Sequence, residues 1–358
     1  MRNILPLLGI GFTTLIVLGV IVAGIVMITI GVGDSDIFKK DTAPAKPKIQ
    51  NAPNQPVPGP QPLPKDSQTL LDARKGFTTK LIQSDYQRSG LDLPVVPQAR
   101  NVTFKSPAGN LGAYLSVPLK KNALMPAVIW VHDGFGGVTE QDWSIAKPFH
   151  DAGFVLMVPS FREENVNNGG RFEMFYGEVD DLLAAIEFVG RQPGVDPNRI
   201  YVAGHGTGGT LTLLAAATGM RSVRAFFAIG GTPDLEESLR DPQADPFEDA
   251  APPFDPKLPN ESRLRSSLAF VAAIRQPTFF FGATKVDPQG CSQARRMETT
   301  ANQYGVPFRV FEIPKATRLN FPVPLVTLVR QKIESDTASN PTSTIRIEYS
   351  QVNQLFNK

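Results

Sequence analysis

The chain has 358 residues, a formal net charge of +2, 42% hydrophobic residues and a single cysteine. This length accommodates one large domain with appendages, and the near-neutral charge excludes the strongly basic surface on which nucleic-acid binding depends. Cys291 alone excludes an intrachain disulfide. No spacing of cysteine and histidine suggests a zinc site, so neither a metal nor a cofactor is expected.

The first segment of the chain is predicted to cross a membrane. Residues 4–32 contain no charged side chain and are dense in Ile, Val, Leu and Gly. The run is longer than the roughly 20 residues that a membrane helix requires. A cleaved signal peptide is the alternative, but its apolar region spans only about 7 to 15 residues and ends at a small-residue cleavage site. We therefore expect an uncleaved, single-pass anchor in the lipid bilayer.

The next segment is predicted to be a spacer between the anchor and a folded body. Residues 33–68 are rich in proline, which favours a semi-extended, polyproline-like chain. Arg2 precedes the anchor, and Asp34 and Asp36 follow it, which favours a body outside the cytoplasm. Lysines further along the spacer oppose that orientation. The globular domain is accordingly predicted to be extracytoplasmic.

Residues 69–340 have the pattern of one α/β domain, and residues 341–358 are expected to form a C-terminal tail. Two alternating strands near residues 101–118 precede a regular alternation of strand and helix, which implies a mostly parallel sheet covered by helices on both faces. The polar, proline-rich stretch 234–265 is either a surface excursion or a lid over the sheet. Strands are expected at 126–131, 154–159, 200–203, 225–229, 278–281 and 308–313, and helices at 142–152, 176–192, 207–219, 292–304 and 324–335.

The turn around residue 206 is expected to organise this domain. A buried strand leads into GHGTG at residues 204–208, and a helix rich in small and apolar residues follows. This pattern matches the nucleophile elbow G-x-S-x-G, in which a sharp turn raises a serine hydroxyl above the sheet. Gly206 stands where the serine is expected, and glycine freely adopts the positive φ of such a turn. The turn is therefore predicted to persist without its nucleophile.

The same glycines allow a second interpretation as a dinucleotide-binding fingerprint. Gly204, Gly206 and Gly209 satisfy G-x-G-x-x-G between a strand and a helix. That motif expects a ribose-binding Asp or Glu about 20 residues later, at the end of the next strand. The sequence RAFFAIGG at residues 224–231 offers neither. The missing acid and the late position in the domain favour the elbow.

Four segments carry a resemblance to a known family. VHDGFGG at residues 131–137 resembles a loop that supplies an oxyanion amide, and GVDPNRIYVAGH at 194–205 leads into the elbow as it does in that family. IRQPTFFFGATKVDP at 274–288 resembles the segment that delivers the catalytic acid, and IPKATRLNF at 313–321 the one that delivers histidine. From about residue 101 to 335 the chain resembles the α/β-hydrolase fold, in its dienelactone hydrolase and prolyl-oligopeptidase-like branch.

This resemblance implies a degenerate catalytic triad at Gly206, Asp287 and Arg318. Gly206 has no side chain, and the guanidinium of Arg318 cannot serve as a general base near neutral pH. Family chain order places histidine last, yet none of the three histidines follows His205. Only Asp287 keeps a suitable residue type, in a loop longer than the family pattern. The resemblance also implies oxyanion amides at two residues, Phe135 and Thr207.

Other chemically competent side chains border the expected pocket, namely His132, Asp133 and His205. A lone thiol without a histidine, as at Cys291, is expected to be inert, and the hydroxyl of Thr207 could simply cap the helix. The sequence therefore predicts a membrane-tethered pseudoenzyme that binds a small ligand or an envelope protein. The alternatives are an active ester or peptide hydrolase with relocated catalytic groups, and a structural protein of the envelope.

Overall fold

The computed structural model describes residues 61–64, 67–83, 92–116, 123–240, 250–317, 320–336 and 344–357. The predicted anchor at residues 4–32 and most of the predicted spacer lie outside these residues. Within the described ranges, no helix has both the length and the apolar character that a membrane crossing requires.

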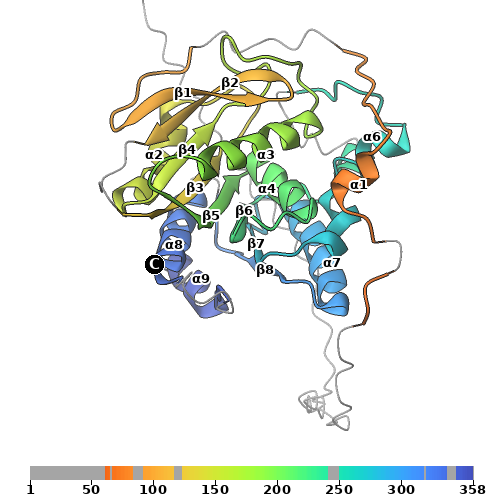
Figure 1. Ribbon diagram of the computed structural model, residues 1–358. Helices are drawn as coiled ribbons and strands as arrows, with labels where there is room; N and C mark the ends of the chain where they lie inside the picture. Colours follow the sequence, from red (N-terminus) through yellow and green to blue (C-terminus); the bar gives the residue numbers. More distant parts are fainter. Residues whose placement is uncertain are drawn as a thin grey trace, which may run out of the picture. The chain divides into compact units, whose positions relative to one another are not determined.

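One eight-stranded sheet forms the centre of the domain (Figure 1). Its strand order is β1-β2-β4-β3-β5-β6-β7-β8. Strand β2 is antiparallel to both of its neighbours, and all the other pairs are parallel, as the alternating sequence predicted. The strands are β1 (Ala99–Ser106), β2 (Gly109–Ser116), β3 (Met125–Val131), β4 (Val155–Pro159), β5 (Val195–His205), β6 (Ala225–Ile229), β7 (Thr278–Gly282) and β8 (Phe308–Glu312).

Helices cover both faces of this sheet and enclose two apolar cores. Helices α3, α4 and α7 pack on one face, and α2, α8 and α9 pack on the other (Figure 1). The central strands are buried along their whole length because both of their faces are covered. The helices are α1 (Leu70–Arg74), α2 (Glu140–Asp151), α3 (Gly177–Gly190), α4 (Thr207–Ala217), α5 (Leu235–Arg240), α6 (Pro259–Arg263), α7 (Pro288–Tyr304), α8 (Pro322–Ser335) and α9 (Tyr349–Phe356), with a 3₁₀ segment η1 (Ser267–Ala273).

Helix α4 approaches the sheet closely at its start, where two residues of the first turn, Gly208 and Gly209, are glycine. A Cβ on Gly208 would lie 2.1 Å from the carbonyl oxygen of Val131 in β3, and one on Gly209 would lie 2.2 Å from that of Gly230, just after β6. No side chain fits at these approaches. The helix therefore begins directly above the carboxyl ends of the central strands.

The last described segment, which the sequence suggests is a tail, packs against the domain. Helix α9 contributes Val352 and Phe356 to the core beneath α8. The Tyr349 hydroxyl donates to the carbonyl oxygen of Val310 at 2.6 Å, and the Val310 amide donates to the carboxylate of Glu298. Because β8 is an edge strand, these side chains cover polar backbone groups that would otherwise be open to pairing.

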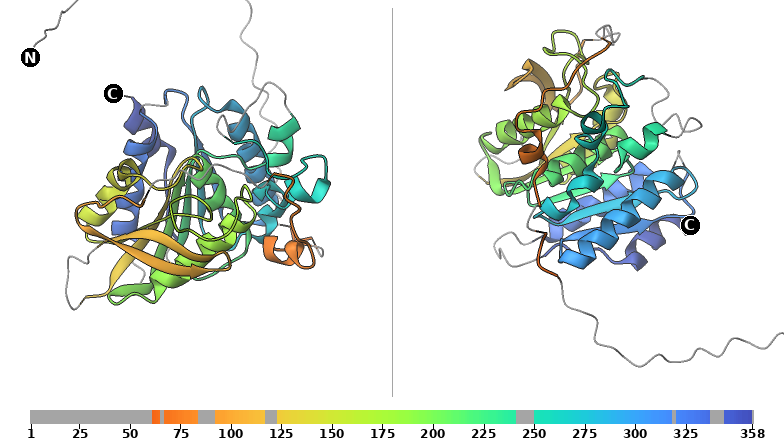
Figure 2. Two further views of the ribbon diagram at one scale, coloured as in Figure 1. Left: turned by 90° about the horizontal axis from the view of Figure 1, so that it is seen from above. Right: turned by 90° about the vertical axis from the view of Figure 1, so that its right-hand side faces the viewer.

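The excursion between β6 and β7 carries α5 and α6 (Figure 2). A buried arginine fastens it to the body of the domain. Residues 241–249 lie outside the description, while α5, α6 and η1 are defined. The guanidinium of Arg265 is fully buried and pairs with Glu261 at 2.7 Å. It also donates to the carbonyl oxygens of Glu173 and Met174 in the loop before α3. This part of the excursion is thus packed into the domain.

Candidate functional site

The elbow has the backbone geometry that the sequence predicted. Strand β5 ends at His205 and α4 begins at Thr207, so that Gly206 forms the whole turn. Gly206 has φ 55° and ψ −116°, a conformation that strains any residue with a Cβ. Its amide donates to the Ile229 carbonyl at 3.0 Å, and its carbonyl accepts from Thr210 at 3.1 Å. The turn is held firmly between two strands and a helix.

The carboxylate of Asp133 lies beside Gly206, against the first amide of α4. Asp133 follows β3, which pairs directly with β5. Its Oδ1 accepts hydrogen bonds from the backbone amides of Thr207 and Gly134, each at 2.9 Å. Thr207 provides the amide after the nucleophile position, which in an active elbow would stabilise an oxyanion. This amide, expected from the sequence, is thus bonded to an internal anion.

The amide from the glycine loop that bonds to Asp133 is that of Gly134, one residue before the expected Phe135. The Phe135 ring packs into the core instead. Its centroid lies 4.8 Å from that of Phe172 and 5.3 Å from that of Phe175. This aromatic contact anchors the loop, which explains how a glycine-rich segment holds a fixed shape beside the elbow.

His205 lies beside the turn but lacks a nucleophile to activate. Its Nδ1 is 3.5 Å from Asp133 Oδ2, and its ring faces that of Phe321 at 6.1 Å between centroids. Burial lowers the pKa of His205, so the ring is neutral near pH 7. The Thr207 hydroxyl donates to the Gly134 carbonyl, away from this ring. Among the described residues, the contacts of this neutral imidazole are a carboxylate and a phenyl ring.

His132 is engaged in a buried ion pair and is not available to an open pocket. Its Nε2 lies 3.1 Å from Glu164 Oε2, and both side chains are almost completely buried. Burial alone would lower the pKa of His132, but the charge and hydrogen bond of Glu164 raise it to about 9. The ring is therefore protonated at neutral pH and cannot accept a proton there.

The two remaining triad positions provide no catalytic pair among the described residues. The Asp287 carboxylate caps α7 by accepting from the Gly290 amide at 2.7 Å, and burial raises its pKa. Arg318 lies outside the described residues. Beside it, Thr317 and Asn320 bond to each other through backbone and side chain. Phe321, which the sequence analysis did not select, is the residue of this loop that contacts His205.

The single thiol and the carboxylate clusters give no alternative reactive centre. Cys291 is buried, and burial raises the pKa of its thiol to about 12, so the thiolate is not populated at neutral pH. Within the described ranges, no three His, Cys, Asp or Glu side chains are arranged to hold a metal ion. Among the described residues, the titratable side chains that contact each other beside the elbow are Asp133 and His205.

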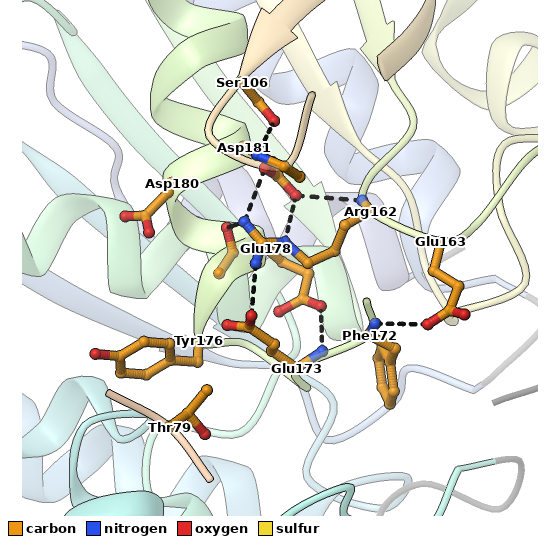
Figure 3. A network of polar contacts seen from close by, with 12 residues as sticks. Thr79, Ser106, Arg162, Glu163, Phe172, Glu173, Tyr176, Glu178, Asp180 and Asp181 are labelled. Atoms are coloured by element: carbon orange, nitrogen blue, oxygen red, sulfur yellow. Dashed lines mark hydrogen bonds and ion pairs between the residues drawn. The ribbon is translucent and has the colours of Figure 1, made fainter. Parts of the chain in front are cut away.

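A second polar cluster, which sequence reasoning missed, lies where α3 begins (Figure 3). The guanidinium of Arg162 forms a two-point ion pair with Asp181, at 2.8 and 3.0 Å, and a third contact with Glu173 at 2.9 Å. Glu178 accepts from the Glu173 amide, and burial raises the pKa of Glu178 to about 7. The side chains come from the loop after β4, the loop before α3 and α3 itself. Their sequence separation and ordinary polarity gave no signal of a cluster.

Solved structures with a similar fold include two peptidases and an esterase. The acylaminoacyl peptidase of Pyrococcus horikoshii has 17% identity and a TM-score of 0.58, over 71% of this chain and 43% of that chain. Dipeptidyl peptidase 4 of Porphyromonas gingivalis has 16% identity and a TM-score of 0.54, over 66% of this chain and 35% of that one. An esterase of Pyrobaculum calidifontis has 18% identity and a TM-score of 0.51, over 67% and 86%.

These likenesses establish the fold and leave function to the site. The chain spans less than half the length of the two peptidases that it matches. No curated protein matches the sequence. A sequence model of the dienelactone hydrolase family matches residues 111–317, which is more than half of the chain. The protein therefore has an α/β-hydrolase fold and belongs to the dienelactone hydrolase family.

Proposed function

We propose that the domain is a pseudoenzyme that binds a small ligand or an envelope protein without hydrolysing it. One observation carries this proposal. The residue with the backbone conformation of the nucleophile is Gly206, which has no reactive atom, and the adjacent Thr207 amide is bonded to Asp133. Loss of the nucleophile or histidine of a triad lowers turnover by about 10⁶-fold. A domain that keeps the fold but lacks the nucleophile and the histidine of the triad can still bind a ligand or a partner, and this supports a binding role.

The distribution of histidines supports the same proposal. No histidine follows residue 205, whereas family order requires one after the acid. His132 is locked by Glu164, and His205 has no hydroxyl or thiol within its described contacts. Restoring a nucleophile alone would therefore leave it without a base.

The test is hydrolysis of an activated ester such as p-nitrophenyl acetate. We expect the native chain and Gly206→Ser to be inert. Burst-type acylation should require Gly206→Ser, Arg318→His and removal of the Asp133 carboxylate together, with Asp287 able to orient the new imidazole. Turnover by the unmodified protein that follows it through purification, and survives Cys291→Ala, Asp133→Ala and Thr207→Val, would falsify the proposal.

A hydrolase with relocated groups is the second candidate, favoured by the pair of His205 and Asp133. A neutral imidazole 3.5 Å from a carboxylate could accept a proton from water. This candidate predicts slow hydrolysis of esters or short peptides that disappears in His205→Gln and persists in His132→Gln. Equal rates for both variants and a blank without protein would exclude it.

We further propose that residues 4–32 anchor the protein and that the domain lies outside the cytoplasm. The support is the uncharged length of that segment and the charges that flank it. The chain should remain in the membrane fraction through alkaline washing, and a C-terminal reporter active only outside the cytoplasm should be active. Soluble protein with a new amino terminus beyond residue 32 would indicate a cleaved signal peptide instead.

A further inference from the structure

The volume that a nucleophile side chain would occupy at the elbow is filled by another residue. A Cβ on Gly206 would lie 2.0 Å from Asp133 Oδ1, 2.4 Å from its Cγ and 2.7 Å from its Oδ2. Cβ atoms essentially never come this close to other heavy atoms. A residue larger than glycine at position 206 therefore requires that the Asp133 carboxylate leave its present position.

The same carboxylate takes the place of a bound anion. Its Oδ1 accepts from the Thr207 amide, the first of α4, and from the Gly134 amide, both at 2.9 Å. The positive end of the helix dipole favours a negative charge there. The Asp133 side chain is half exposed, so it lies at an open surface where an external anion could otherwise reach these amides. The structure thus combines an oxyanion-type donor pair with an internal acceptor.

We propose that Asp133 is an autoinhibitory plug of the elbow, coupled to the glycine at position 206. The carboxylate satisfies the two amides and excludes carbonyl and carboxylate ligands from them, and the absence of a side chain at residue 206 makes room for it. With Asp133 in this position, both amides already have an acceptor. This inference rests on the contacts of Asp133 and stands even if the proposed lack of hydrolysis is refuted.

The coupling is tested by a double-mutant cycle on the full chain in detergent, read as melting temperature. Backbone strain at residue 206 is common to both backgrounds, whereas the collision with Asp133 exists only in the native one. Gly206→Ala should therefore lower the melting temperature by about 2 °C more in the native background than in Asp133→Ala. Asp133→Asn keeps the side-chain volume and one acceptor oxygen, and it should retain the full penalty. Asp142→Ala, which removes a carboxylate that caps α2, should be additive with Gly206→Ala. If the effects of Gly206→Ala and Asp133→Ala on the melting temperature also add, the proposed coupling between the two residues is wrong.

Acetate titration tests the plug directly and also decides the matter if Gly206→Ala does not fold. A ligand that binds only the folded protein raises its melting temperature with concentration. At constant ionic strength, up to about 0.1 M acetate should leave the native chain and Asp133→Asn unchanged relative to chloride. The same titration should raise the melting temperature of Asp133→Ala saturably. A saturable rise in the native chain, or none in Asp133→Ala, would contradict the plug. Neither result depends on ester hydrolysis, so the two proposals can fail separately.

Discussion

Two glycines of this domain leave room for a charged side chain from elsewhere in the chain, and their surroundings differ. At Gly206 the space holds the half-exposed carboxylate of Asp133. At Gly177, in the first turn of α3, it holds the buried guanidinium of Arg162, which a Cβ would approach to 1.7 Å. Asp133 can rotate into solvent, whereas Arg162 is held by Asp181 and Glu173. The charge beside Gly177 is therefore buried and held by several partners, whereas the charge beside Gly206 is half open to solvent.

The largest expected effect comes from removing the buried guanidinium. Arg162→Met leaves the fully buried carboxylate of Asp181 without its ion-pair partner, which should cost about 3–5 kcal/mol of unfolding free energy. Arg330→Met is the matched control because its partner Glu334 is exposed one turn along α8, and it should cost at most about 0.5 kcal/mol. Urea unfolding of both variants checks this difference. Equal losses of unfolding free energy in the two variants would show that the buried Arg162 cluster contributes no more to stability than an exposed ion pair.

The two glycines themselves provide the next comparison. Gly177→Ala drives a methyl group into the fixed Arg162 guanidinium and should cost about 3 kcal/mol through overpacking. Gly206→Ala can displace Asp133 into solvent, so it should cost about 1–2 kcal/mol, mostly from strain at positive φ. The reverse order in thermal unfolding would mean that Asp133 is held more firmly than Arg162.

Glu178 makes the buried cluster sensitive to rising pH. Burial raises its pKa from 4.5 to about 7, so between these values the unfolded chain is ionised while the folded chain keeps the proton. The contribution of Glu178 to the free energy of unfolding is therefore fully present below about pH 4.5. It is lost as pH rises to 7, which lowers the stability by up to about 3 kcal/mol. Glu178→Gln should flatten this part of the profile, as measured by melting temperature from pH 4.5 to 8. Parallel profiles for the two proteins would refute the assignment.

The elbow should respond to pH in the opposite direction and more weakly. Burial lowers the pKa of His205 below its usual 6.5, so the unfolded chain takes up a proton before the folded one does. Its contribution to stability is present above pH 6.5 and is lost as pH falls through the lowered pKa. His205→Gln should remove this loss while changing stability at pH 8 by less than about 1 kcal/mol. A larger loss at pH 8 would show that the elbow depends structurally on this ring.

The secondary structure was largely predictable because the spacing of apolar residues that marks a strand or a helix is visible within a short stretch of sequence. The strands at 225–229 and the helix after Gly206 were placed correctly, since buried parallel strands are continuously apolar and the glycine turn separates strand from helix. Strand β5 is longer than expected and starts at Val195, which pairs with Met125. Nothing local in the polar sequence at residues 196–199 indicates that pairing.

The fold family and the glycine at the elbow position were readable from the chain alone, because residue identity at 206 and the order of the histidines are properties of the sequence. Only the tertiary structure decided what fills the resulting space. Asp133 and Gly206 are far apart in the chain, and they meet because β3 lies beside β5 and α4 begins close above both strands. In the same way, His132 pairs with Glu164 because β3 and β4, which precede these residues, are neighbours in the sheet.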